Sequence, residues 1–315
     1  MKYVGLQTQI WKNNTRSLIL LILFPVVLLA LAWLLVFFTS EPEFRDIRSV
    51  SGQFLLFVPW IVIGVGIWFM IAWFSHTAMI NAATGSKPLE RKENKRVYNL
   101  VENLSIAAGM KMPKVNIIED DSLNAFASGI NDKTYTVALS RGIIDKLNDD
   151  ELEGVIAHEL THIRNRDVRL LIISVIFVGI FAFIAEALFR SMRFGAMTRS
   201  SGRKGGGNAA GVLIALALAL VGYLLASLFR FAISRKREYM ADAGAATLTK
   251  KPVALASALR KVSGDPVIEA VKRKDVAQMF IENPQLSDKD KGFSFSSLFA
   301  THPPIRNRIE VLEGF

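Results

Sequence analysis

Four long apolar stretches constrain the fold of this chain more than any other feature. Residues 18–38 and 54–74 each run for 21 positions without a formally charged side chain, and residues 170–189 and 209–229 are further apolar segments. About 20 helical residues cross a hydrocarbon core of roughly 30 Å. The first segment lacks the small-residue cleavage site of a signal peptide. The sequence therefore predicts a helical membrane protein that keeps its first segment as an anchor.

The distribution of basic residues predicts the orientation in the membrane. Lys2, Lys12 and Arg16 precede the first segment, residues 39–53 hold three acidic residues against two arginines, and residues 87–96 hold five basic residues. Because basic loops stay on the cytoplasmic side, we expect the N-terminus and the region after residue 80 to be cytoplasmic. The chain has a net charge of +10, and its basic residues cluster at the ends of the apolar segments. This placement indicates contact with a lipid surface and not with nucleic acid.

The loop between the third and fourth apolar segments departs from this pattern. It carries no acidic residue and five basic ones: Arg190, Arg193, Arg199, Arg203 and Lys204. Two full crossings would place this basic loop outside. Either the two segments form a hairpin that does not cross completely, or the first two helices determine the topology and overrule the loop. Both arrangements return residue 235 to the side that holds residue 158.

His158, Glu159 and His162 form a His-Glu-x-x-His sequence. Positions i and i+4 share one face of a helix, so both imidazoles can bind one zinc ion while Glu159 serves as a general base. Acidic residues at 149–153 favour a helix start there, and Asn148 or Asp149 can cap it. Cysteine is absent, so zinc here must use nitrogen and oxygen ligands.

A catalytic zinc ion usually takes three protein ligands and leaves one position for water. No histidine follows His162 at short range, and Glu238 is the best candidate for the third ligand. Asp242, one helical turn later, can orient a liganding histidine. The alternative is that Glu238 is an exposed helical acid after the basic run 235–237.

The remaining periodicity predicts the other elements. Residues 90–108 read as an amphipathic helix that ends at Gly109, and we expect short strands at 114–118, 124–128 and 134–139. Helices are expected at 141–147, 233–247 and 252–263 and from about residue 303, and a loop or small lid at 282–299. The apolar positions expected in the helix at 90–108 are Val97, Leu100, Val101, Leu104 and Ile106.

Several motifs together resemble the HtpX-type membrane zinc endopeptidases and, more distantly, the CAAX prenyl endopeptidases. Besides His-Glu-x-x-His, they are Glu238-x-x-Ala241-Asp242, Asn124-Ala125-Phe126 and Thr301-His302-Pro303-Pro304 followed by Arg308-Ile309. The resemblance implies one zinc ion per chain, bound by His158, His162 and Glu238, with Glu159 as the catalytic base. It also implies quality control and stress-related degradation of misfolded or damaged membrane proteins at the cytoplasmic face of the bacterial inner membrane. The polar lead at residues 1–17 departs from the family pattern and resembles a longer variant.

The expected fold is a mainly α, α+β membrane protein with four apolar helices and a gluzincin-like cytoplasmic catalytic domain that contains a small sheet. We expect two transmembrane helices after a short polar N-terminus in residues 1–80, and a catalytic segment with the sheet and zinc-binding helix in 81–166. A transmembrane or membrane-embedded hairpin follows in 167–230. A second catalytic segment, with the third ligand and the C-terminal helices, completes the chain in 231–315.

The expected substrates are unfolded or misfolded membrane proteins. Residues 124–128 form either a sheet edge that pairs with an extended substrate through Asn124, Ala125 and Phe126, or an interior strand with Phe126 in the core. By the resemblance, His302 or Asn124 stabilises the oxyanion, and His302 is equally suited to precede the last helix as a capping residue.

Three rival functions were compared with this hypothesis. The charged residues at 149–153 and 164–169 argue against an intramembrane metalloprotease, which buries its motif in an apolar helix. The apolar segments lack the polar pathway of a transporter. The remaining alternative is a non-proteolytic zinc-binding scaffold, although a structural zinc site needs four ligands and no base.

Overall fold

The computed structural model describes residues 6–197, 207–231, 235–263 and 303–314. The chain divides into two compact units, which we call the head unit (Met1–Arg16, Ser75–Ile172 and Phe231–Phe315) and the apolar unit (Ser17–Phe74 and Ile173–Arg230). The predicted lid at 282–299 and His302 lie outside the described residues. The predicted division of the chain at residues 80, 166 and 230 stays a prediction.

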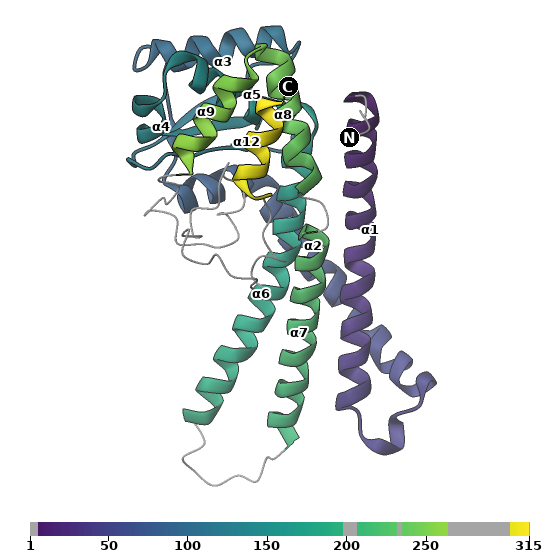
Figure 1. The fold of residues 1–315 in the computed structure, drawn as a ribbon. Coiled ribbons are helices and arrows are strands. Elements are labelled where there is room, and N and C mark those ends of the chain that lie inside the picture. The colour runs from purple at the N-terminus through teal and green to yellow at the C-terminus, as the bar shows by residue number, and fades with distance from the viewer. Residues whose placement is uncertain (1–5, 198–206, 232–234, 264–302, 315) are drawn as a thin grey trace. The chain divides into compact units, whose positions relative to one another are not determined.

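Four long helices carry the predicted apolar segments: α1 (Leu6–Thr39), α2 (Ile47–Thr84), α6 (Asp167–Met197) and α7 (Gly207–Phe231) (Figure 1). A short 3-10 helix, η1 (Pro42–Phe44), connects the first two. Within the described residues, α1, α2 and α6 are long and apolar enough to cross a membrane, whereas the apolar part of α7 is the shorter segment Leu213–Leu225. The prediction of four apolar helices is confirmed.

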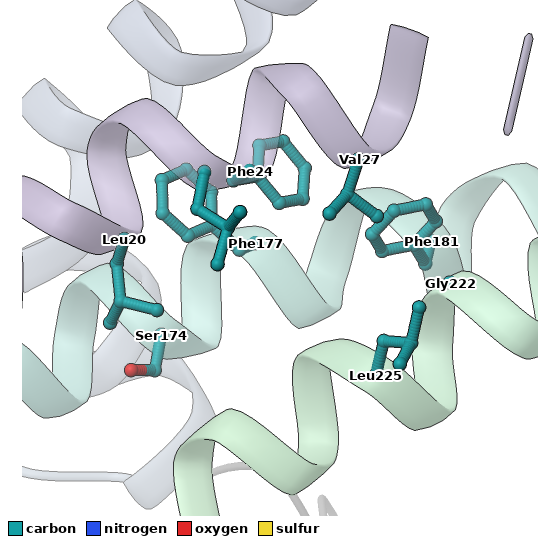
Figure 2. Close-up of a pocket in the computed structure, with 9 residues that line it drawn as sticks. Leu20, Phe24, Val27, Ser174, Phe177, Phe181, Gly222 and Leu225 are labelled. Carbon is teal, nitrogen blue, oxygen red and sulfur yellow. The ribbon is translucent and has the colours of Figure 1, made fainter. Parts of the chain in front are cut away.

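Aromatic packing holds the apolar unit together. Phe24 of α1 stacks on Phe177 of α6 with ring centroids 4.0 Å apart, and it meets Phe181 edge-on at 5.4 Å. A Cβ atom on Gly222 of α7 would lie 2.2 Å from the ring of Phe181, so only glycine permits this approach of α6 and α7. These helices line a small, mainly apolar pocket (Figure 2), formed by Leu20, Leu23, Phe24, Val27, Ser174, Phe177, Phe181, Gly222 and Leu225.

The head unit contains a four-stranded sheet in the order β1-β2-β4-β3. Its strands are β1 (Lys87–Pro88), β2 (Lys114–Ile118), β3 (Ala125–Ser128) and β4 (Thr136–Ser140). Strand β2 runs parallel to β4, and β3 runs antiparallel to β4 with Ala125 opposite Leu139. The three predicted strands are confirmed with small changes of boundary. Strand β4 begins two residues late because Thr134 closes a turn on Asn131.

The described residues of the head unit also form six further helices: α3 (Lys95–Ala107), α4 (Arg141–Lys146), α5 (Asp149–Arg164), α8 (Arg235–Thr249), α9 (Pro252–Val262) and α12 (Ile305–Glu313). The expected start of α3 at residue 90 is wrong, because Asn94 caps the helix by accepting a hydrogen bond from the backbone of Val97. The expectation of Ile106 as an apolar contact is also wrong, since it is 73% exposed.

Helix α5 is the centre of the head unit and packs against α3, α8, α9 and β3. A capping box starts it, in which Asn148 accepts from the backbone of Glu151 and the Glu151 side chain accepts from the backbone of Asn148. Helix α8 crosses α5 closely, because a Cβ atom on Gly244 would lie 2.4 Å from Cγ2 of Thr161. Glycine at this position therefore sets the separation of the two helices.

We expect Gly244→Ala to destabilise the protein by about 1–3 kcal/mol, because the added methyl group overpacks a buried contact. A loss of stability would be informative, because alanine normally stabilises a helix interior by about 1 kcal/mol relative to glycine. The measurement is thermal unfolding in detergent. Gly52→Ala in α2, where an added Cβ meets nothing within 4 Å, is the control and is expected to leave stability unchanged or raised. Equal behaviour of the two variants would contradict the close crossing.

Candidate metal centre

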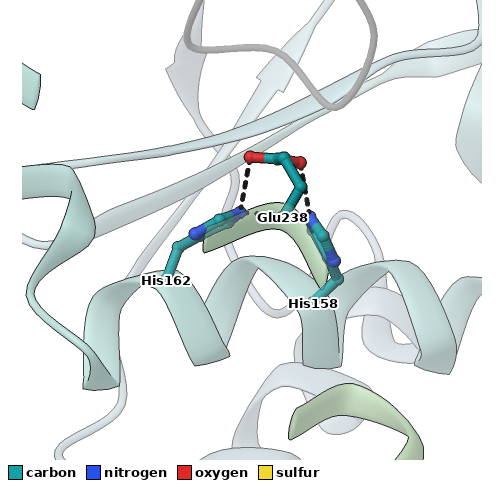
Figure 3. Close-up of side chains that lie close together, drawn as sticks. All are labelled: His158, His162 and Glu238. Carbon is teal, nitrogen blue, oxygen red and sulfur yellow. Dashed lines mark hydrogen bonds and ion pairs between the residues drawn. The ribbon is translucent and has the colours of Figure 1, made fainter. Parts of the chain in front are cut away.

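Helices α5 and α8 bring three potential ligands to one point (Figure 3). The Nε2 atoms of His158 and His162 lie 3.1 Å apart. The Glu238 carboxylate places Oε2 at 3.6 Å from Nε2 of His158 and Oε1 at 3.5 Å from Nε2 of His162. The structure thus brings together the three residues that the sequence analysis selected as ligands.

The spacing of these atoms suits a small cation. Zinc–nitrogen and zinc–oxygen bonds are about 2.0–2.2 Å long, so two ligands of a tetrahedral ion are separated by about 3.3 Å. The three separations here, from 3.1 to 3.6 Å, bracket that value. A single ion can therefore bind all three side chains with little rearrangement.

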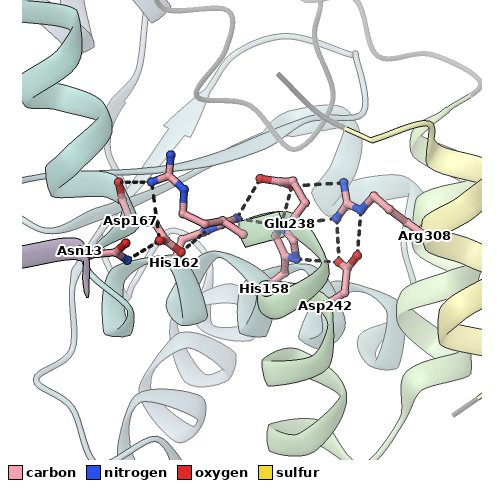
Figure 4. A network of polar contacts seen from close by, with 8 residues as sticks. Asn13, His158, His162, Asp167, Glu238, Asp242 and Arg308 are labelled. Atoms are coloured by element: carbon pink, nitrogen blue, oxygen red, sulfur yellow. Dashed lines mark hydrogen bonds and ion pairs between the residues drawn. The ribbon is translucent and has the colours of Figure 1, made fainter. Parts of the chain in front are cut away.

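A carboxylate lies beside the other ring nitrogen of each histidine (Figure 4). Nδ1 of His158 lies 2.9 Å from Oδ1 of Asp242, and Nδ1 of His162 lies 3.1 Å from Oδ2 of Asp167. An ionised carboxylate only accepts hydrogen bonds, so both contacts favour the tautomer with the proton on Nδ1. In the neutral rings the Nε2 lone pairs then face each other and the Glu238 carboxylate, an arrangement that repels unless a positive charge lies between them. This donor set fits a bound metal ion.

The buried charges of the site also favour a bound cation. The cluster contains four buried carboxylates, those of Glu159, Asp167, Glu238 and Asp242, and two buried guanidinium groups, those of Arg237 and Arg308. When both imidazoles are neutral, as metal ligation requires, two negative charges remain uncompensated. Buried charges are costly unless they are paired or bind a metal. A divalent cation would neutralise this cluster.

The pKa values of the site reflect the same electrostatics. Burial lowers the pKa of His158, but the adjacent carboxylates of Asp242 and Glu238 outweigh this effect and raise it to about 9. In the metal-free protein His158 therefore holds a second proton at neutral pH, and a metal ion must displace it to bind. Burial also raises the pKa of Glu159, against the opposing effect of both imidazoles. A carboxylate of raised pKa suits proton transfer near neutral pH.

Arg308 is a component of the site to which the sequence analysis gave no role. From α12 it donates two hydrogen bonds to Asp242, at 2.9 Å from Nε and 2.7 Å from Nη2, and its Nη1 lies 3.4 Å from Oε2 of Glu238. Burial would raise the pKa of Asp242, but Arg308 and His158 hold it below its usual value. The sequence contains a signal for this role, because Arg308 lies four residues before Leu312 and so shares its face of the last helix. In the structure both side chains are buried.

The other predicted site residues lie at β3. Asn124, directly before this strand, is buried and exchanges hydrogen bonds with Ser140, from its N–H to Oγ at 3.0 Å and from the Ser140 N–H to its C=O at 3.0 Å. Strand β3 lies at one end of the strand order, and Phe126 is nonetheless buried in the core. Strand β3 is therefore at an edge of the described sheet with Phe126 in the core, and its pairing with a substrate stays a prediction.

Comparison with known proteins decides the family. The family model described as peptidase family M48 matches residues 91–315. The chain belongs to this family. Among its relatives, the Protease HtpX homolog of Bacteroides fragilis is 58% identical over 322 residues and covers 100% of both chains. That of Dictyoglomus turgidum is 41% identical over 259 residues, covering 79% of this chain and 81% of the relative.

The Lactobacillus helveticus Protease HtpX homolog is 34% identical over 313 residues, covering 98% of this chain and 99% of the relative. Among solved structures, the crystal structure of S. mikatae Ste24p matches with 17% identity and a TM-score of 0.49, over 96% of this chain and 66% of that one. The M48 assignment and the apolar helices make the chain a membrane metalloprotease of the HtpX type. The alternative of a non-proteolytic scaffold is not supported.

We expect Arg308→Met to destabilise this M48 peptidase by about 3–5 kcal/mol, because it leaves the buried Asp242 carboxylate without its main cationic partner. Denaturant unfolding of the metal-free protein measures the effect. Arg306→Met removes the same charge from the exposed face of the same helix, and a change within about 0.5 kcal/mol is expected. Wild-type stability of Arg308→Met would contradict the structural role of this ion pair.

Proposed function

We propose that this M48 peptidase is a zinc-dependent endopeptidase, in which His158, His162 and Glu238 hold one zinc ion per chain. The observation that carries the proposal is the convergence of two Nε2 atoms and one carboxylate, with a carboxylate beside each Nδ1 atom. When bound, zinc supplies Lewis acidity toward water and a peptide carbonyl group. Asp242 keeps His158 in the tautomer and ring orientation that ligation requires.

Glu159 is the proposed general base. It follows His158 directly on α5, and its side chain is buried in the charged cluster. It accepts a proton from the attacking water and passes that proton to the leaving amine as the peptide bond breaks. Burial raises the pKa of Glu159, which makes its carboxylate a better proton acceptor.

We further propose that an extended segment of an unfolded substrate lies along β3 and is read mainly through its backbone. The terminal place of β3 in the strand order and its packing against α5 support this proposal. Asn124 begins the strand and is a candidate to stabilise the oxyanion together with His302. Recognition through the main chain suits substrates that share a misfolded state rather than a sequence.

The proposed location is the cytoplasmic membrane of a bacterium, with the catalytic site facing the cytoplasm. The basic residues before α1 and after α2 support this orientation, as do the candidate spans of α1, α2 and α6. The proposed substrates are misfolded or damaged membrane proteins, and the proposed role is protein quality control under stress. The HtpX-type relatives support a role as a protease at the membrane.

Replacing the base separates catalysis from metal binding. We expect Glu159→Gln to retain zinc at one ion per chain and to cleave unfolded casein about 10²–10⁴-fold more slowly, because only the proton acceptor is lost. Zinc content and casein cleavage are measured on protein purified in detergent. Glu153→Gln removes a carboxylate from the same helix and should behave as wild type, whereas Glu238→Ala should lose zinc. Undiminished cleavage by Glu159→Gln would disprove the mechanism.

The orientation can be tested by cysteine labelling, because the natural chain contains no cysteine. We expect Glu43→Cys, in the exposed η1 segment, to react with a membrane-impermeant maleimide in intact spheroplasts. Lys250→Cys, on an exposed residue that follows α8, should react only after the membrane is permeabilised. The reverse labelling pattern would place the catalytic site on the opposite side of the membrane.

A further inference from the structure

The polar lead before the first apolar segment belongs to the head unit up to Arg16. Its described residues, from Leu6 on, are helical and continuous with the first apolar segment in α1. Asn13 within it is fully buried and donates from Nδ2 to the carbonyl oxygen of Asn165 at 2.7 Å and to Oδ1 of Asp167 at 2.7 Å. The lead therefore reaches residues about 150 positions away in the sequence.

Asp167 connects this contact to the metal centre. Its Oδ1 accepts from Asn13, while its Oδ2 lies 3.1 Å from Nδ1 of His162 (Figure 4). Arg237, next to Glu238 in α8, donates from Nη1 to the Asp167 carbonyl oxygen at 3.3 Å and lies 3.6 Å from Oδ1. The two oxygens of one buried carboxylate thus face the lead and a proposed metal ligand.

The orientation of this carboxylate matters for the metal. A histidine ligand whose other nitrogen donates to a carboxylate is held in one tautomer and is more basic toward the ion. That effect requires Oδ2 of Asp167 to stay in line with Nδ1 of His162. The Asn13 amide donates to Oδ1 of Asp167 and also to the carbonyl oxygen of Asn165. These two hydrogen bonds limit rotation of the Asp167 side chain.

The junction between α5 and α6 also depends on the lead. Arg166 has a φ of 59°, a left-handed conformation that is unfavourable for a residue with a side chain. Its Nη1 donates to Oδ1 of Asn14 at 3.1 Å. Asn13 and Asn14 together contact both residues between α5 and α6 and the first residue of α6, but only Asn13 contacts the carboxylate that faces His162.

We propose that Asn13 is a positioning residue of the metal centre, which holds Asp167 in the orientation that receives the Nδ1–H of His162. The polar start of α1 then contributes to the metal centre and does not only precede the first apolar segment. This inference rests on the proposed ligation of zinc by His162. It adds Asn13 and Asp167 to the residues that determine zinc affinity.

Zinc affinity of the full-length protein in detergent, measured by competition with a chelator, tests the proposal. Asp167→Asn is expected to raise the zinc Kd by about 10–100-fold, the usual effect of removing a carboxylate behind a histidine ligand, and Asn13→Ala by about three- to tenfold. Asn14→Ala is the matched control. It removes a hydrogen bond from the same helical turn to the same junction and should leave the Kd within about twofold of wild type.

A double-mutant cycle separates positioning from a general structural effect. If Asn13 acts through Asp167, adding Asn13→Ala to Asp167→Asn should change the Kd by less than about twofold. Asn13→Leu, which keeps the same number and branching of side-chain heavy atoms, should weaken zinc binding as Asn13→Ala does. The absorption spectrum of bound Co²⁺ should shift in Asn13→Ala and not in Asn14→Ala, because it reports ligand geometry.

Three results would overturn the role of Asn13: a Kd for Asn13→Ala no larger than that for Asn14→Ala, full additivity with Asp167→Asn, or wild-type affinity in Asn13→Leu. A different result identifies failure of the proposed function itself. If His162→Ala bound zinc as tightly as wild type, His162 would not be a ligand, whatever the behaviour of Asn13. The two failures are therefore distinguishable.

Discussion

The close crossing of α5 and α8 is the contact on which the rest of the head unit depends. Helix α5 carries both histidines and the proposed base, and α8 carries the carboxylate that completes the candidate metal centre. Gly244 permits this approach because a Cβ atom there would collide with Thr161. The same crossing buries Asp242 beside His158. One glycine thus links the packing of two helices to the geometry of a charged site.

The metal centre is built from charges that are unfavourable in the metal-free protein. Two imidazoles and a carboxylate converge, and further carboxylates lie behind each imidazole. Arg308 and Arg237 offset part of this negative charge. Burial lowers the pKa of His158, but Asp242 and Glu238 raise it above its ordinary value, which favours a proton on this ring when no metal is bound. The buried polar network therefore favours metal binding at the expense of the stability of the empty site, as active sites commonly do.

Elements with a clear local pattern could be predicted closely. Strand 114–118 and helix 252–262 were expected within one residue of their observed ends, because Asp120-Asp121 follow the strand and Pro252 occupies the first position of the helix. Strand β1 was missed because two residues carry no period. Residues 90–94 were assigned to a helix although Asn94 is a stronger capping residue than any before it. Ile106 was expected to contact the core, yet the helix turns it to solvent in its last turn.

The sequence by itself determined the apolar helices and the spacing of His158, Glu159 and His162, because a helical period places residues i and i+4 on one face whatever surrounds them. It also identified Glu238 and Asp242 as the partners expected at long range. Only the tertiary structure assigned Asn13, Asp167 and Arg308 to the same network. Asn13 contacts Asp167 across 154 positions and Arg308 contacts Asp242 across 66, and such contacts follow from packing rather than from any local pattern. Asp167 lies only five positions after His162, but in the next helix.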